Sequence, residues 1–126
     1  MNFPDDLLYS PDHLWVRVKR GVAIVGLSDF AQAHLGNILY VDLPSIGQAV
    51  TAGQEMGFAV EAAKSMTDLI SPVTGSVVEV NNSLSDDPAP LNSDPYAAGW
   101  LAKIEIIGPL SAELMEAGAY RQSVGA

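Results

Sequence analysis

The chain has 126 residues, of which 48% are hydrophobic and 17% charged, and its 15 acidic and 6 basic residues give a formal net charge of -9. It contains no cysteine, which excludes thiol proteases, thioredoxin-like enzymes, zinc ribbons and iron–sulfur proteins. The excess of acids disfavours nucleic acids and anionic membranes, because their phosphates attract basic surfaces. We therefore expect one acidic, monomeric, cytoplasmic domain spanning residues 1–126, which binds neither nucleic acid nor membrane.

Short apolar runs separated by glycine, proline, asparagine and aspartate predict a mainly β fold. In one run, strict alternation places Met56, Phe58 and Val60 on a face that can be buried. The candidate strands are Leu14 to Lys19, Val22 to Leu27, Ile38 to Leu43, Glu55 to Val60, Thr67 to Ile70, Ser76 to Val80 and Trp100 to Ile107. Their layout suits two small sheets related by a pseudo-two-fold axis and joined at a tight hairpin.

Two helices are predicted between and after these strands. Ser28 and Asp29 are suited to capping a short helix that Gly36 would end in a left-handed conformation. A second helix is predicted to begin at Ser111 and to run to Gly118. The polar stretch 81–94 is predicted to be a loop.

Lys64 lies at the predicted hairpin, and the only other lysines, Lys19 and Lys103, fall within predicted strands. A lysine at a turn is most simply a solvated surface charge. The neighbouring Ala62 and Ala63, however, leave room for an enzyme that must enclose the amine. Lys64 is therefore a candidate for covalent modification.

The segment EAAKSMTDLISPVTGSVVEVN, residues 61–81, resembles the lipoyl-attachment hairpin of the glycine cleavage system H protein. The resemblance covers nearly all of the chain from Trp15 to Tyr120. Further matching residues are Val25 to Gln32, Leu35, Gly36, Val41, Leu43, Pro44, Gly47, Asn92, Asp94, Pro95, Tyr96 and Gly99 to Leu101.

This resemblance implies a barrel-sandwich hybrid of two small sheets with short helices, one of them C-terminal. It also implies lipoic acid in amide linkage to Lys64, attached by a lipoate ligase or lipoyltransferase. The dithiolane would supply the two sulfurs that this cysteine-free chain lacks. The implied protein is a swinging-arm carrier and no catalyst, and tethering raises the local concentration of its reactive group.

The chain departs from the family pattern at Leu14, where H proteins usually have a glutamate that is implicated in holding the aminomethyl-loaded arm. In one interpretation Asp12 or Asp68 takes over the amine. The partners are then glycine decarboxylase, aminomethyltransferase and dihydrolipoyl dehydrogenase. In the other, the chain is an H-like lipoate-binding protein that carries sulfur intermediates for a heterodisulfide-reductase-like complex. We favour the sulfur-oxidation interpretation because the substitution falls at the expected functional cleft.

Three further residues are candidates for contacts with the expected arm. Glu61 and Asp68 are retained from the family pattern, and His13 either lines the cleft of the arm or is a hydrogen-bonded structural residue.

A biotin carrier would have methionine on both sides of the lysine, whereas Met66 is displaced by one position. An acid hydrolase using Glu61 and Asp68 is disfavoured because nothing would desolvate either carboxylate. No metal site is expected, since His34 has no second ligand at suitable spacing.

Overall fold

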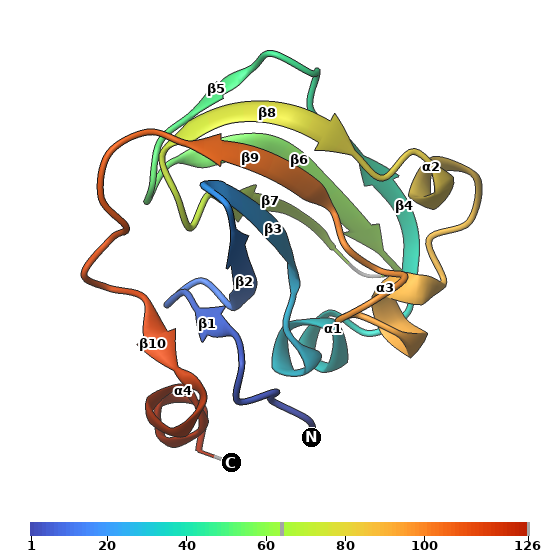
Figure 1. Ribbon diagram of the computed structural model, residues 1–126. Coiled ribbons are helices and arrows are strands. Elements are labelled where there is room, and N and C mark those ends of the chain that lie inside the picture. The colour runs from blue at the N-terminus through green and yellow to red at the C-terminus, as the bar shows by residue number, and fades with distance from the viewer. Residues whose placement is uncertain (64, 126) are drawn as a thin grey trace.

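The computed structural model describes residues 1–63 and 65–125 and consists mainly of β-strands (Figure 1). One sheet has seven strands in the order β10-β1-β2-β3-β9-β8-β5, and the other has three in the order β4-β6-β7. The strands are β1 Leu8–Tyr9, β2 Leu14–Lys19, β3 Val22–Leu27, β4 Ile38–Asp42, β5 Ala49–Val50, β6 Glu55–Ala62, β7 Met66–Ile70, β8 Gly75–Val80, β9 Ala102–Ile106 and β10 Met115–Glu116. The helices are α1 Asp29–Leu35, α2 Ser83–Asp86, α3 Pro90–Ser93 and α4 Ala117–Ser123. The predicted mainly β fold with two sheets and a C-terminal helix is confirmed. The tight hairpin does not join the two sheets as predicted, because β6 and β7 pair with each other within the three-stranded sheet.

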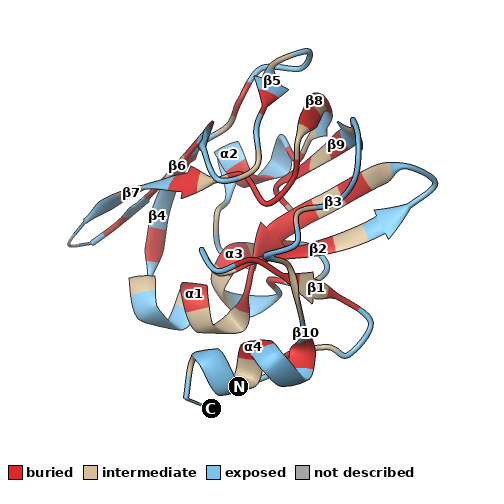
Figure 2. Cartoon of the chain, turned by 90° about the vertical axis from the view of Figure 1, so that its left-hand side faces the viewer, coloured by how far each residue is buried: buried red, intermediate tan, exposed pale blue. Residues whose placement is uncertain are grey.

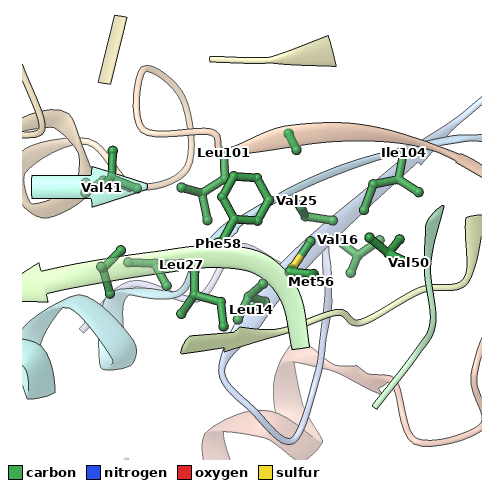
Figure 3. Close-up of a cluster of buried hydrophobic side chains, with 14 of the residues drawn as sticks. Leu14, Val16, Val25, Leu27, Val41, Val50, Met56, Phe58, Leu101 and Ile104 are labelled. Atoms are coloured by element: carbon green, nitrogen blue, oxygen red, sulfur yellow. The ribbon is translucent and has the colours of Figure 1, made fainter. Parts of the chain in front are cut away.

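The hydrophobic core lies between the two sheets. Strand β6 alternates as predicted, with Met56, Phe58 and Val60 buried and Glu55 and Glu61 exposed. Figure 3 shows the Phe58 ring facing Leu101 and Val25, which belong to the side of the larger sheet. Phe58 is therefore one of the side chains that join the sheets.

Helix α1 has the cap that the sequence predicts. The Ser28 hydroxyl oxygen accepts a hydrogen bond from the Ala31 backbone N–H, and Asp29 lies in the first turn. Gly36 ends the helix at a φ of 78°, which favours glycine, but its ψ of -157° lies outside the left-handed helical region that was predicted.

The helix predicted from Ser111 to Gly118 is wrong. The chain makes turns after Ser111, then forms β10, and only then begins α4 at Ala117. Strand β10 pairs antiparallel with β1, so a long-range partner overrides the local helical pattern. The polar stretch 81–94 is also not purely a loop, because it contains the short helices α2 and α3.

A second apolar cluster fastens α4 to the N-terminal segment. Tyr120 of α4 stacks on Tyr9 with ring centroids 4.6 Å apart, and Phe3 meets Tyr120 edge to face at 5.3 Å. Arg121 also donates a hydrogen bond to the Phe3 carbonyl oxygen. Figure 2 shows α4 buried on one side and exposed over the rest. The C-terminal helix is thus held by the face that carries its buried residues Ala117 and Tyr120.

Candidate functional site

The hairpin expected around position 64 is present in its flanking strands. Strands β6 and β7 pair antiparallel with Glu61 opposite Met66, and the Ala62 N–H donates to the Ser65 carbonyl oxygen at 2.9 Å. Lys64 itself lies outside the described residues. The strands therefore form the predicted hairpin on both sides of this position.

A pocket of about 390 Å³ opens beside the hairpin. Thr67 and Leu69 of β7 form one wall, and helix α1 provides much of the rest. The described residues that line it are Asp12, His13, Leu27, Phe30, Ala31, His34, Leu35, Thr67 and Leu69. Most of these side chains are apolar, and within residues 1–63 and 65–125 the lining includes one carboxylate, that of Asp12, and no lysine or arginine. The pocket suits an apolar chain that ends in a polar or cationic group.

Both histidines of the chain line this pocket, and each ring packs against Phe30. The Phe30 ring centroid lies 4.8 Å from that of His13 and 5.9 Å from that of His34, and the Phe30 and His34 rings are stacked. From the sequence, His34 is considered only as a metal ligand, and its place in this pocket is not predicted. Its occurrence in the same helix as Phe30 and Leu35 was the available signal.

His13 is held in a fixed position at the pocket wall. Its φ of 72° is unusual for a residue with a side chain, and its carbonyl oxygen accepts a hydrogen bond from the Ser28 N–H. The ring Nδ1 lies 2.9 Å from the Tyr120 hydroxyl oxygen. Burial lowers the pKa of His13 below its ordinary value, with a smaller lowering effect from His34 and an opposing effect from Asp12. His13 is thus both a pocket residue and a hydrogen-bonded structural residue.

The three candidate carboxylates are placed differently. All three are exposed, and Asp12 lines the pocket, whereas Glu61 and Asp68 are not among its described lining residues. Successive residues of a strand point to opposite faces, so Asp68 points away from the face that Thr67 and Leu69 present to the pocket. Of these candidates, the structure brings Asp12 and His13 together.

Across residues 1–63 and 65–125, no group of three or more His, Cys, Asp or Glu side chains is arranged to hold a metal ion. Within the same part of the chain, no helix has the length and apolar character needed to cross a membrane.

Comparison with known proteins gives one consistent result. A family model described as glycine cleavage H-protein matches residues 7–125. The chain belongs to the glycine cleavage H-protein family. Glycine cleavage system H proteins from Myxococcus xanthus and Marinobacter nauticus are 45% and 46% identical to it. These alignments cover 94% and 98% of this chain and 92% and 95% of theirs.

The fold agrees with that of a solved H protein. The crystal structure of a glycine cleavage system H protein from Mycobacterium marinum matches with a TM-score of 0.91 at 36% identity. It covers 98% of this chain and 100% of the other. The resemblance drawn from the hairpin sequence is confirmed over almost the whole length.

These comparisons support the glycine cleavage interpretation better than the sulfur-oxidation interpretation that we favoured. The relatives at about 45% identity are named glycine cleavage system H proteins. H proteins are lipoyl carriers and not catalysts, which agrees with the expectation of a non-enzyme.

Leu14, the residue that favoured sulfur oxidation, is not a described lining residue of the pocket. It is completely buried in the core between the sheets. It lies opposite Leu27, which does line the pocket, so the Leu14 side chain is the neighbour of Leu27 on the same face of the sheet. In this chain the pocket has its carboxylate at Asp12 instead.

Proposed function

We propose that this chain is a carrier of the glycine cleavage system, folded as one domain over residues 1–126, with a lipoyl group in amide linkage to Lys64. The pocket beside the β6–β7 hairpin is the observation that carries the proposal. Its wall residue Thr67 is three positions beyond Lys64, and three residues span at most roughly 11 Å. A long arm attached at Lys64 can therefore reach the pocket.

The pocket residues fit such an arm. The apolar side chains Leu27, Phe30 and Leu69 match the hydrocarbon chain and the sulfur ring of a lipoyl group. Asp12 offers an anionic partner to a protonated amine. When bound to the protein, the lipoyl group supplies two sulfurs, one of which can carry an aminomethyl group.

The residues of the chain have binding roles and no role as nucleophile or general base. The apolar wall excludes water from the arm, and Asp12 holds the proton of a cationic amine in a charge-assisted hydrogen bond.

The outward-facing Glu61 and Asp68 are proposed to contact the enzymes that handle the arm. These are a lipoate ligase or lipoyltransferase, glycine decarboxylase, aminomethyltransferase and dihydrolipoyl dehydrogenase, in a cytoplasmic multienzyme system where the carrier is a monomer.

Asp12→Asn is expected to loosen the loaded arm. The change keeps the size of the side chain but removes the charge. Asp12 is exposed, and an exposed ion pair contributes about 0.2–1 kcal/mol, so loss of the aminomethyl group should accelerate up to about fivefold. Intact mass spectrometry over time measures how fast the loaded mass falls to that of the dihydrolipoyl form, as water releases the aminomethyl group as formaldehyde and ammonium.

Asp68→Asn is the matched control, since it makes the same chemical change on the opposite face of the sheet. We expect its rate of loss to equal that of the unmodified sequence. Equal rates for the Asp12 and Asp68 variants would contradict the assignment of Asp12. A faster loss in Asp68→Asn alone would assign the amine to Asp68.

A further inference from the structure

Three side chains from distant parts of the sequence form a continuous hydrogen-bonded chain at the pocket. His13 Nδ1 lies 2.9 Å from Tyr120 Oη, and Tyr120 Oη lies 2.7 Å from Ser28 Oγ. Ser28 Oγ also accepts a hydrogen bond from the Ala31 N–H at 3.1 Å. Ser28 and Tyr120 are completely buried, so water cannot replace a missing partner.

The positions of the protons follow from counting donors and acceptors. Ser28 and Tyr120 each have one hydroxyl proton, and the two links from Ser28 to Tyr120 and from Tyr120 to His13 need one proton each. If Ser28 donates to Tyr120 and Tyr120 donates to His13 Nδ1, both protons are used. In this arrangement Nδ1 is an acceptor, and the neutral ring has its proton on Nε2.

The opposite direction leaves a buried proton without a partner. If His13 Nδ1 carried a proton, it would donate to Tyr120, and Tyr120 would donate to Ser28. The Ser28 hydroxyl would then need a further acceptor, and none lies within hydrogen-bond distance among residues 1–63 and 65–125. Folded proteins rarely leave a buried donor unpaired. The same objection applies to a doubly protonated ring.

We propose that Tyr120 and Ser28 are positioning residues that hold His13 as the neutral imidazole with its proton on Nε2. Ser28 is fixed in turn because it caps helix α1, and Tyr120 is fixed because α4 packs its aromatic face on the N-terminal segment. Docking of the C-terminal helix therefore determines the protonation state of a pocket residue.

The groups that face His13 from its neighbouring elements are Asp12, His34 and Tyr120. Asp12 favours the charged imidazolium, whereas burial and His34 oppose it. Tyr120 enters as a neutral donor, since burial raises the pKa of its hydroxyl despite the hydrogen bond from Ser28. The hydrogen-bonded chain adds a preference for one tautomer that burial alone cannot give.

The tautomer has a consequence for the arm, which rests on the proposed function. When His13 is neutral, it offers its Nε2–H as a hydrogen-bond donor and carries no charge. Of the pair Asp12 and His13, only Asp12 then carries a formal charge. A cationic aminomethyl group then meets no repulsion from His13, whereas a charged imidazolium would oppose it. Truncation of α4 should weaken retention of the loaded arm without altering attachment of the lipoyl group.

The first test is nitrogen NMR of the two histidine rings in the protein without a lipoyl group, at pH 7.5. We expect His13 to show a protonated Nε2 and an unprotonated, hydrogen-bonded Nδ1. A protonated Nδ1 would overturn the proposal. Because the measurement uses no arm, its outcome is independent of whether the chain serves glycine cleavage.

The second test is Tyr120→Phe, with Tyr96→Phe as the matched control. The Tyr96 hydroxyl accepts a hydrogen bond from the Asp29 N–H and donates one to the Asn2 carbonyl oxygen. It has no place in the hydrogen-bonded series of His13, Tyr120 and Ser28. In Tyr120→Phe we expect loss of the single tautomer and a rise in the pKa of His13, with neither change in Tyr96→Phe. A folded Tyr120→Phe variant that keeps both the tautomer and the pKa of His13 would contradict the role of Tyr120. If that variant does not fold, the tautomer of the unmodified sequence still decides.

Discussion

Lys64→Arg is expected to abolish lipoylation completely. The guanidinium group of arginine stays protonated at physiological pH and cannot form the amide that a lysine amine forms. We expect a lipoate ligase to add one lipoyl mass to the unmodified sequence and none to Lys64→Arg, as measured by intact mass spectrometry.

The matched control is Lys103→Arg. Lys103 is one of the two other lysines, pairs with Glu79 at 3.3 Å and lies over the Trp100 ring. Arginine can keep both contacts, so this variant should fold normally and accept one lipoyl group. A lipoyl mass on Lys64→Arg would show that the arm is attached elsewhere.

Phe58→Ala is expected to lower the free energy of unfolding by about 3–5 kcal/mol. Phe58 is 1% exposed and packs in the core between the sheets, so its removal leaves a cavity that the surrounding strands cannot fill. This loss is large beside the total stability of about 5–15 kcal/mol that is usual for a domain. The midpoint of urea unfolding, followed by tryptophan fluorescence, measures the change.

Val78→Ala is the control for Phe58→Ala. Val78 is an apolar residue of β8 that is 42% exposed, and its truncation should change the free energy of unfolding by no more than about 0.5 kcal/mol. A loss below about 1.5 kcal/mol in Phe58→Ala would mean that this ring does not join the two sheets.

Much of the fold could be predicted because alternation is a local signal. The strands Leu14–Lys19 and Val22–Leu27 begin and end where the pattern places them, and α1 begins at its serine cap. The C-terminal helix was misplaced because the residues before it pair with β1, more than a hundred positions earlier. Helices α2 and α3 have four residues each, too few to show helical periodicity.

The site could be predicted only in part. Lys64 stands out from the sequence of the hairpin, but the pocket depends on helix α1 and β7 lining the same cavity, which is a matter of tertiary packing. Alternation along β7 could have predicted that Thr67 and Asp68 point to opposite faces of the sheet. It would then have favoured Asp12 over Asp68 as the carboxylate that binds the amine. Tyr120 gave no sequence signal, because its partners lie about a hundred residues away.

The most direct test of the account is glycine-dependent loading of the lipoylated chain. The protein is incubated with glycine and a competent glycine decarboxylase, beside an authentic H protein and the Lys64→Arg variant, and the intact mass is measured. The account predicts an added aminomethyl group on this chain and on the authentic H protein, and none on the variant. A lipoylated chain that stays unloaded while the authentic H protein loads would contradict it.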